Sequence, residues 1–489
     1  MADTDPHHAR RWAILAILGT AQLMVVLDAT VVNIALPSAQ QALHFSSDNR
    51  QWIVTAYALA FGSLLLLGGR ISDMFGRKWT FIAGLVGFSL ASAVAGSAQS
   101  FGMLVIARTF QGAFGALLAP AALSLLTVTF TDGKERAKAF GIFSAVAASG
   151  ASVGLLLGGV LTQTLNWRFC MYVNLIFATG AVIGALILLT NSRPAVRPKL
   201  DIPGTLAVSG GLFALVYGFS RAQTTSWTNQ LTIASLVIAV VLLVAFAVIQ
   251  FRAKHPLLPP RVFLNRNRAA SFISIGLTTS AMFAVFLFLT YYLQRSLGYS
   301  PIKTGLAFMP LTAVIMVTAV VGLTKLQGRM GPRWLAAGGM LLGAAGMTLL
   351  TRVGVHSNYV AAILPALLIM GVGMGLVFST AIGNATYGVE AADAGVASAT
   401  LNASQQVGGS IGVALLSTLA ASAVTSYIGG QHRTSALLAQ ATVHGYTTAF
   451  GFAAGIFLVG ALAAAVLFSG KIRSGEPVAK PVAAPALAN

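Results

Sequence analysis

The sequence predicts an all-α integral membrane protein that crosses the bilayer fourteen times, with both termini in the cytoplasm. The 489 residues are 56% apolar and only 8% charged, whereas roughly 25% of residues are charged in an average soluble domain. The chain also contains fourteen apolar runs, most of them close to the roughly 20 residues that a helix needs to cross a bilayer core. Finally, Lys and Arg are distributed unequally between alternate loops, which indicates the orientation.

The apolar runs are long and unbroken, which favours helices over the roughly ten-residue alternating strands of a membrane barrel. The first run is too long for the apolar segment of a signal peptide, and it contains Asp28, so we expect it to remain as a span. The pattern does not fix the ends of the seventh and eighth runs. The expected spans are 12–36, 52–69, 79–98, 102–127, 138–161, 167–190, 203–220, 230–251, 269–293, 304–325, 334–352, 358–381, 396–420 and 446–468.

The net charge of +19 raises the question of nucleic-acid binding. With the N-terminus inside, 22 of the 30 Lys and Arg residues fall in inside loops and tails, seven in outside loops and one within a span. This asymmetry follows the positive-inside rule. The basic residues therefore indicate topology in a plasma or inner membrane, with anionic membrane lipid as a partner. Nucleic acid is not an expected partner.

A weak internal repeat predicts the domain organisation. The segment DMFGRKW at 73–79 resembles GRMGPRW at 328–334, which lies 255 residues later. Parallel repeats of this kind occur in transporters built from two six-helix halves. The offset predicts a six-helix bundle at 1–190, a linker with two inserted helices at 191–268 and a second six-helix bundle at 269–468. Residues 469–489 are expected to form a disordered cytoplasmic tail.

The sequence predicts neither an enzyme nor a metal or cofactor site. Cys170 is the one cysteine, which excludes an internal disulfide and any multi-cysteine metal site. The seven histidines are scattered over loops and termini. A membrane enzyme would need a nucleophile–base pair or metal ligands within the spans, and the sequence places no pair of histidine or cysteine there.

One acidic residue of the eleven, Asp28, falls inside an expected span. A charge at mid-helix costs about 2.5–3.5 kcal/mol on insertion scales, so it indicates a functional role and requires a partner or a water-filled cavity. The one intramembrane cation is Arg108. At about 1.5 Å per residue, Asp28 lies roughly 12 Å and Arg108 roughly 9 Å from the outer ends of their helices. The two charges are therefore expected at similar depth, either for coupling or as a purely structural ion pair.

The fourth span carries polar and small residues on one narrow stripe, formed by Arg108, Gln111, Gly112 and Gly115. At 100° per residue these four positions share a face. Such a face suits a cavity or a close helix contact. Asn33 lies five residues beyond Asp28, about 140° round the first helix, so these two residues need not share a face.

Glycines mark the fifth span. Gly150, Gly154 and Gly158 recur every four residues, and Gly159 is adjacent. Small residues at this spacing let helices approach closely, either for plain packing or as a sliding surface between domains.

The segment GGRISDMFGRK at 68–78 interrupts the apolar pattern and predicts a short inside loop. Glycines allow a tight turn there. The simpler interpretation is a turn whose basic residues set the membrane topology. Asp73 is not needed for that role. The functional alternative is a gating latch that makes and breaks salt bridges during conformational change, formed by Gly69, Asp73, Gly76, Arg77 and Lys78.

These segments together resemble the major facilitator superfamily, in particular its fourteen-helix drug:proton antiporter family. The similarity rests on GGRISDMFGRK, on LVIARTFQGAFGA around Arg108, on LDATVVNIALP around Asp28, on LDIPGTLAVSG at 200–210 and on GVASATLNASQQVGGSIGVALL at 395–416. It implies two six-helix bundles plus two extra helices. It further implies that Asp28 and Arg108 form the proton-coupling region and that Asp73 and Arg77 belong to an inner gate.

Two departures from the family pattern concern proline. Leu155 stands where the antiporter signature of the fifth helix has proline, and the proline expected after Asn174 is also missing. The fifth helix therefore gives weaker evidence for export than the other motifs do.

The resemblance implies a monomeric proton-coupled antiporter that exports amphipathic or cationic drugs or antibiotics from the cytoplasm by alternating access. Open alternatives are a dedicated exporter of one natural product and an importer or monovalent-cation antiporter on the same fold. The absence of a second intramembrane acid argues against dicationic substrates. Candidate residues of the substrate cavity are polar or aromatic side chains within the spans, namely Asn33, Trp52, Tyr57, Gln111, Phe283, Phe286, Tyr291, Tyr292, Asn402 and Gln406.

Overall fold

The computed structural model describes residues 10–46, 49–130, 133–190, 201–253, 256–322, 326, 329–386, 389, 394–429, 432 and 434–469. All regular secondary structure within these ranges is helical, as predicted. The first eight helices are α1 (Arg11–Leu43), α2 (Gln51–Phe75), α3 (Arg77–Gly96), α4 (Phe101–Thr129), α5 (Gly133–Thr164), α6 (Phe169–Leu188), α7 (Ile202–Thr224) and α8 (Gln230–Arg252). The remaining helices are the short α9 (Pro260–Phe263), α10 (Arg266–Tyr291), α11 (Pro301–Val321), α12 (Pro332–Leu350), α13 (Leu364–Thr386), α14 (Ala394–Ile428) and α15 (Ser435–Leu467).

Thirteen helices of the described chain are long and apolar enough to cross a membrane. The predicted fifth span falls in α5, which has 32 residues. Its described apolar segment is the shorter Val153–Thr164. The seventh and eighth spans, whose ends the sequence left open, form α7 and α8 as a helical hairpin in close contact. The prediction of membrane-spanning helices is confirmed, while the count of fourteen stays a prediction at α5.

The helix ends follow local side-chain chemistry. Ser100 accepts a hydrogen bond from the backbone N–H of Met103 at 3.3 Å at the start of α4. Asn265 and Thr434 cap the first turns of α10 and α15 in the same way. Such caps satisfy backbone donors that a helix leaves free at its N-terminus.

The inside loop predicted at 68–78 is wrong in extent. Helix α2 continues to Phe75 and α3 begins at Arg77, so Gly76 alone separates them. Gly76 has a φ of 98°, a conformation that glycine adopts without steric cost. Gly68 instead serves packing, because a Cβ at this position would overlap the backbone carbonyl of Ala116 on α4.

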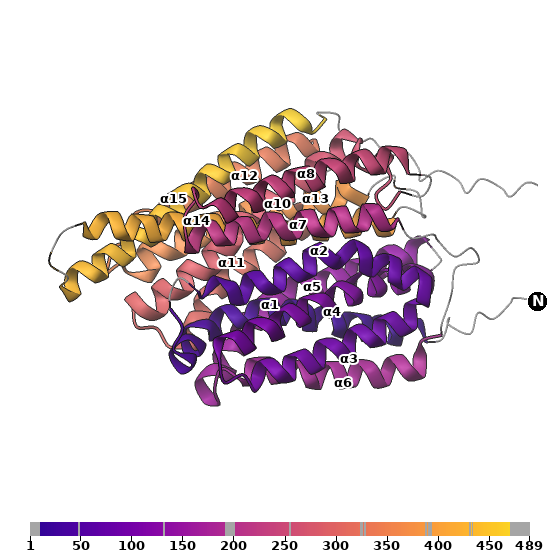
Figure 1. The fold of residues 1–489 in the computed structure, drawn as a ribbon, viewed down its shortest axis with the longest axis horizontal. Helices are drawn as coiled ribbons and strands as arrows, with labels where there is room; N and C mark the ends of the chain where they lie inside the picture. Colours follow the sequence, from indigo (N-terminus) through magenta and orange to yellow (C-terminus); the bar gives the residue numbers. More distant parts are fainter. Residues whose placement is uncertain are drawn as a thin grey trace, which may run out of the picture.

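The connection between the last two expected spans, 421–445, is also largely helical in its described residues. Helix α14 extends to Ile428, and α15 begins at Ser435 rather than near residue 446. With 35 and 33 residues at about 1.5 Å per residue, both exceed a bilayer core of about 30 Å. The α14–α15 hairpin accordingly extends beyond the other helices at one end of the molecule (Figure 1). The apolar pattern did not predict these extra helical turns of α14 and α15, because a helical segment outside the membrane needs no apolar side chains.

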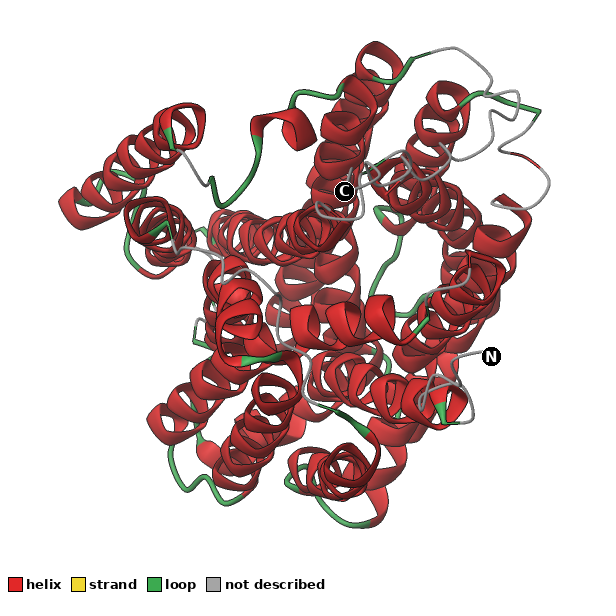
Figure 2. Cartoon of the chain, turned by 90° about the vertical axis from the view of Figure 1, so that its right-hand side faces the viewer, coloured by secondary structure: helices red, strands yellow, loops and turns green. Residues whose placement is uncertain are grey.

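The helices pack in three groups. Helices α1 to α6 contact one another through α1–α5, α1–α6, α2–α4, α3–α4 and α3–α6. Helices α10 to α15 are joined by α10–α14, α10–α15, α11–α13, α12–α13 and α12–α15. The α7–α8 hairpin lies beside α2 and α14 (Figure 1). Figure 2 shows the described chain from the side, as helices joined by loops. Contacts α5–α11 and α2–α14 connect the first group to the second. The predicted boundaries at residues 190, 268 and 468 stay predictions.

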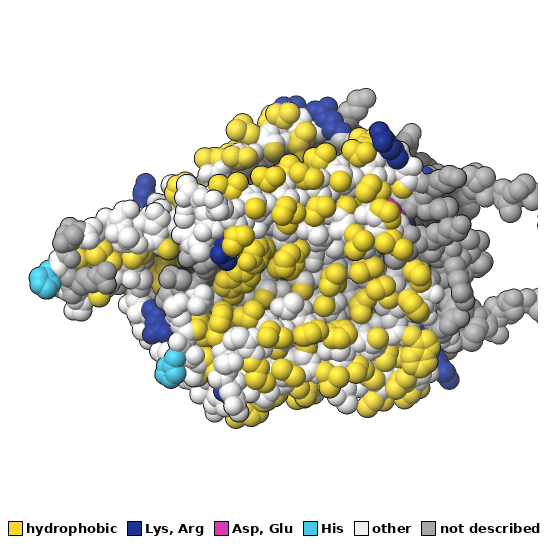
Figure 3. All heavy atoms as spheres, in the orientation of Figure 1, with side chains coloured by type: hydrophobic (Ala, Val, Ile, Leu, Met, Phe, Trp, Pro, Cys, Tyr) yellow, Lys and Arg dark blue, Asp and Glu magenta, His cyan; other side chains and the backbone are white. Residues whose placement is uncertain are grey.

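Apolar side chains cover the middle of the molecule, while Lys and Arg lie toward its two ends (Figure 3). Helix α8 is the most exposed of the thirteen candidate spans, because only 17% of its most apolar segment is buried. Exposed large apolar side chains on its surface include Val237, Val241, Val244 and Phe251. An apolar surface around a whole helix is typical of contact with lipid.

Candidate functional site

Asp28 and Arg108 form a buried ion pair between α1 and α4. Arg108 Nη1 lies 2.5 Å from Asp28 Oδ2. Asp28 is fully buried, and Arg108 is 1% exposed. The partner that the sequence required for Asp28 is therefore Arg108.

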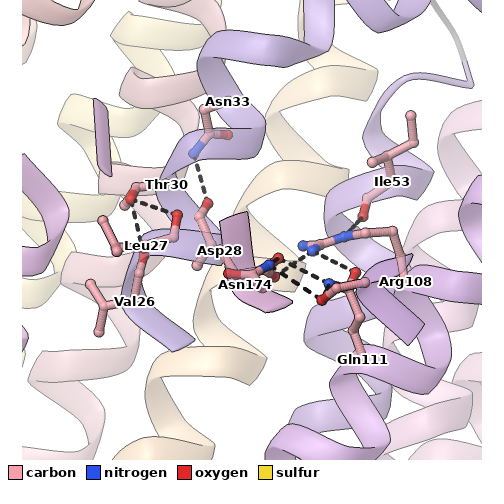
Figure 4. A network of polar contacts seen from close by, with 11 residues as sticks. Val26, Leu27, Asp28, Thr30, Asn33, Ile53, Arg108, Gln111 and Asn174 are labelled. Atoms are coloured by element: carbon pink, nitrogen blue, oxygen red, sulfur yellow. Dashed lines mark hydrogen bonds and ion pairs between the residues drawn. The ribbon is translucent and has the colours of Figure 1, made fainter. Parts of the chain in front are cut away.

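Three further side chains complete a polar network around the carboxylate (Figure 4). Asp28 Oδ1 accepts hydrogen bonds from Asn174 Nδ2 on α6 at 2.7 Å and from Gln111 Nε2 on α4 at 3.0 Å. The hydroxyl of Ser92 on α3 accepts from Gln111 Nε2 at 2.7 Å and from Asn174 Nδ2 at 3.3 Å. Ser92, Gln111 and Asn174 are all fully buried. Side chains from four helices, α1, α3, α4 and α6, thus form one buried network.

The guanidinium of Arg108 has a second set of contacts that do not involve Asp28. Its Nε donates to the backbone carbonyl of Ile53 on α2 at 3.2 Å, and its Nη1 donates to Gln111 Oε1 at 3.0 Å. The guanidinium carbon lies 4.5 Å from the ring centre of Tyr57 on α2. An arginine over an aromatic face at this distance is attracted by the ring. Arg108 therefore keeps partners if the charge on Asp28 is removed.

A crevice adjoins Arg108 on the side toward the predicted outer face. It opens toward the surface and has room for roughly one water molecule. Apart from Arg108, its lining is apolar and comes from α1, α2, α4, α6 and the segment before α6: Val32, Ala35, Leu36, Ala39, Ile53, Leu104, Trp167 and Met171. The guanidinium of Arg108 thus borders a small, mostly apolar void in the first helix group.

The network suits the ionised form of Asp28. All three groups that contact its two oxygens are N–H donors, and a carboxylate accepts such bonds at both oxygens. Removing either charge of a buried pair leaves the other uncompensated, which is costly. A proton added to Asp28 would therefore change both the charge and the hydrogen bonds of the whole network. Within the described ranges, no three His, Cys, Asp or Glu side chains gather at a possible metal site.

Comparison with known proteins identifies the family. Residues 18–413 match the family model of the Major Facilitator Superfamily. The chain belongs to the major facilitator superfamily. The family consists of membrane transporters, so this chain is a multi-pass transport protein.

Relatives of this major facilitator protein are named for antibiotic resistance or export. It is 46% identical over 479 residues to a puromycin resistance protein of Streptomyces alboniger, covering 98% of this chain and 95% of that protein. It is 36% identical to a cephamycin export protein of Amycolatopsis lactamdurans, covering 83% and 85%. A lincomycin resistance protein of Streptomyces lincolnensis is 34% identical, with 85% of each chain covered.

Solved structures show the same fold. The crystal structure of a bacterial homologue of the human lysosomal transporter Spinster matches with a TM-score of 0.67 at 17% identity, covering 95% of this chain and 97% of that one. A peptide transporter structure matches with a TM-score of 0.66 at 14% identity, covering 93% of each chain. The predicted major facilitator fold is confirmed.

The polar stripe on α4 of this major facilitator protein faces α2. A Cβ at Gly112 would overlap the backbone carbonyl of Tyr57, and one at Gly115 would lie 2.9 Å from the ring of Phe61. These glycines hold α2 close to Arg108, which brings the Ile53 carbonyl and the Tyr57 ring within reach. The stripe therefore serves close helix contact at its glycines and the buried network at Arg108 and Gln111.

We expect Gly112→Ala to lower the free energy of unfolding by about 1–3 kcal/mol, because the added methyl group has no space against α2. Gly102→Ala is the matched control on the same helix, since nothing lies within 4 Å of a Cβ there. The thermal stability of detergent-solubilised protein, followed by size-exclusion chromatography, measures the difference. Equal melting temperatures for the two variants would contradict this account of the α2–α4 contact.

The glycines of α5 contact two helices. Gly150, Gly154 and Gly158 pack on α1, where a Cβ at Gly158 would lie 3.1 Å from the backbone of Val31. Gly159 faces α11 instead, because a Cβ there would lie 2.6 Å from the carbonyl oxygen of Pro301. The first three glycines thus pack within one helix group, and the fourth lies where the two groups meet.

The residues of the predicted gating latch lie around the α2–α3 turn. Lys78 Nζ donates to the carbonyl of Leu186 on α6 at 3.0 Å. Gly69 packs on Pro120 of α4, and Arg77 is half-buried at the start of α3. The side chain of Asp73 lies outside the described part of the chain, so the latch stays a prediction.

Several candidates for the substrate cavity have other partners in the structure. Tyr57 lies against Arg108, and Asn33 Nδ2 donates to the carbonyl of Ala29 in its own helix at 3.1 Å. Tyr292 Oη donates to the carbonyl of Gly354 at 2.6 Å. Phe286 packs against Phe308 with tilted rings, 5.3 Å apart between ring centres.

The other candidates lie at contacts between helix groups. Tyr291 Oη donates to Gln40 Oε1 on α1 at 2.9 Å. Trp52 lies 6.2 Å from Tyr217 of α7 between ring centres. Asn402 and Gln406 are half-buried on α14, and Gln406 lies against Gly62 of α2. The side chain of Phe283 lies outside the described part.

Sequence reasoning did not assign a role to Ser92 or Asn174. Both are polar residues within apolar runs. Ser92 lies six residues before the outer end of the expected span 79–98, and Asn174 lies seven residues after the outer end of 167–190, which is roughly 9 and 10 Å at about 1.5 Å per residue. This is the depth calculated for Asp28 and Arg108, so the same arithmetic applied to uncharged residues would have selected them.

Proposed function

We propose that this protein is a proton-coupled antiporter that exports amphipathic antibiotics from the cytoplasm by alternating access. The observation that carries the proposal is the ion pair of Asp28 and Arg108 in a fully buried network. An ionisable residue in the membrane interior costs insertion energy and marks an ion or proton pathway by default. A merely structural role would be met more cheaply by apolar residues.

In this mechanism a proton from the outer side binds Asp28 and neutralises it. The ion pair is then lost, while Arg108 keeps the Ile53 carbonyl, Gln111 and the Tyr57 ring as partners. Loss of the pair changes the packing of α1 against α4 and biases the equilibrium between two states. The crevice beside Arg108 offers protons an approach from the outer side. When the proton is released to the cytoplasm, Asp28 and Arg108 form the ion pair again, and substrate binds in the same step.

Alternating access requires two bodies that separate at one end at a time. We assign these bodies to 1–190 and 269–468, with α7 and α8 as the inserted helices, and place both termini in the cytoplasm. Hydrogen bonds between the bodies join Tyr291 to Gln40, Gln294 to the carbonyl of Ile34, and the N–H of Ile302 to Gln163. Since all three lie toward the proposed outer end, this arrangement corresponds to a state closed to the outside.

The names of the relatives suggest the first substrates to test. The relative at 46% identity is a puromycin resistance protein, so puromycin is the first probe. A second candidate is a dedicated exporter of one natural product, because the cephamycin and tetracenomycin C relatives are named for the export of single compounds. A panel of unrelated antibiotics separates the two, since a dedicated exporter protects cells against one class alone.

The test of proton coupling uses everted membrane vesicles whose lumen is acidified by respiration. Adding puromycin should release protons from the lumen, seen as recovery of acridine orange fluorescence, in vesicles with this protein and not in vesicles without it. Lincomycin and a cephalosporin are added in turn as further probes. Accumulation of a probe in the vesicles without any proton release would contradict antiport. Loss of a preloaded probe from the lumen together with protons would indicate an importer, because the lumen of an everted vesicle corresponds to the outside of the cell.

A further inference from the structure

Asn174 is the one member of the network with an unused hydrogen-bonding atom on its amide. Its Nδ2 donates to Asp28 Oδ1 at 2.7 Å and to Ser92 at 3.3 Å. Its Oδ1 is buried and has no hydrogen-bond partner among the described residues. Gln111 differs, because its Oε1 accepts from Arg108 at 3.0 Å. The carbonyl oxygen of Gln111 therefore already accepts a hydrogen bond, whereas that of Asn174 is able to accept one.

The orientation of the Asn174 amide depends on the charge of Asp28. A carboxylate only accepts hydrogen bonds, so the N–H group must face it, as it does here. A protonated carboxyl group carries an O–H donor, and this donor needs an acceptor in a site from which water is excluded. Rotation of the amide by about 180° exchanges Nδ2 and Oδ1 with little change in shape.

We propose that Asn174 is a positioning residue that stabilises both protonation states of Asp28 by reversing its amide. In the ionised state Nδ2 donates to Asp28 Oδ1. When a proton from the outer side binds Asp28 Oδ1, the reversed amide presents its Oδ1 as the acceptor of that O–H. The inference rests on the proposed function, in which Asp28 is the group that takes up the proton.

Ser92 is suited to follow this reversal. Its hydroxyl now accepts from both amides, at 2.7 Å from Gln111 and 3.3 Å from Asn174. A hydroxyl both donates and accepts and rotates freely to do so. After reversal it can donate to Asn174 Oδ1 while still accepting from Gln111. The reversed N–H group would face the position of the unpartnered Oδ1, so the protonated network is less well satisfied and favours rearrangement.

The ionisable groups around Asp28 come from three helices. Arg108 on α4 is the ion-pair partner, Tyr57 on α2 lies against Arg108, and Cys170 is buried on α6. Helix α3 contributes the hydroxyl of Ser92, and α5 contributes Gly154 at this level. Of the two amides that contact Asp28 Oδ1, that of Asn174 lies at 2.7 Å and that of Gln111 at 3.0 Å.

The test is infrared difference spectroscopy of the purified, reconstituted protein as the pH is lowered. Wild-type protein should show a band from a protonated carboxyl group that is absent in Asp28→Asn. Asn174→Leu should move this band to higher wavenumber, because the O–H loses its acceptor. Asn33→Leu is the matched control, since Asn33 is buried on α1 but bonds only its own backbone, and the band should not move.

The outcomes separate the inference from the proposed function. A carboxyl band that disappears in Asp28→Asn but has the same position in Asn174→Leu would overturn the role of Asn174 and leave proton binding by Asp28 intact. A wild-type protein without any band that depends on Asp28 would overturn the proposed function itself. If the leucine variant does not insert, Asn174→Ala removes the same amide without added bulk and is measured in its place.

Discussion

Asp28→Asn is expected to abolish proton-coupled export while leaving the protein in the membrane. The amide has nearly the same shape as the carboxyl group but cannot bind and release a proton. Vesicles with this variant should show no puromycin-induced proton release, and cells should lose resistance to the wild-type substrates. The second measurement is the movement of a probe down its own concentration gradient, because a transporter that no longer couples to protons can still carry out this movement.

The substitution also leaves Arg108 buried without its counter-charge, and breaking a buried pair costs roughly 3–5 kcal/mol. Activity must therefore be normalised to the amount of folded protein in the membrane. Asp201→Asn is the matched control, because Asp201 is a carboxylate outside the network that caps α7 and accepts from the N–H of Gly204 at 2.9 Å. It should retain proton release at equal protein levels. Retention by Asp28→Asn as well would show that the carboxylate is structural.

The sequence predicted the parts of the molecule that depend on the cost of burying charge. Asp28 and Arg108 could be paired from hydropathy and helix rise alone, because few partners are available to a charge in a membrane. Their uncharged neighbours Ser92 and Asn174 were not predicted. A lone serine or asparagine in an apolar run costs less free energy to bury than a charge does, so it is a less specific sign of a buried partner.

Other features depend on tertiary contact and could not be read from periodicity. The sequence allowed Tyr57 to face substrate, yet the structure places its ring against Arg108. Three glycines of the α2–α3 segment suggested a loop, but only Gly76 adopts a positive φ there, while Gly68 admits the backbone of α4. A glycine for turning and a glycine for close packing look alike in sequence, and only the neighbouring helix distinguishes them.

Cross-linking α5 to α11 at the proposed outer end is expected to stop transport completely and reversibly. Gln163 on α5 accepts a hydrogen bond from the N–H of Ile302 on α11 at 3.3 Å, so cysteines at these two positions lie within reach of a short thiosulfonate cross-linker. The protein has one native cysteine, Cys170, which is buried and should not compete. A reducing agent should restore the rate.

The physical reason is that the two bodies must part at this end for substrate to leave. The contact is tight, because Gly305 of α11 also packs on the backbone of Leu155, where a Cβ would lie 2.6 Å from the carbonyl oxygen. Leu155 stands at the position of the missing proline, so α5 approaches α11 here without the bend that a proline would allow. Cysteines at Tyr299 and Tyr359, whose rings are 6.5 Å apart within the second proposed body, form the control pair. Their cross-link should leave transport unaffected, because both residues move together. If the Gln163–Ile302 pair is fully cross-linked and the rate remains that of the untreated protein, the bodies do not separate along α5 and α11, and export must use a different motion.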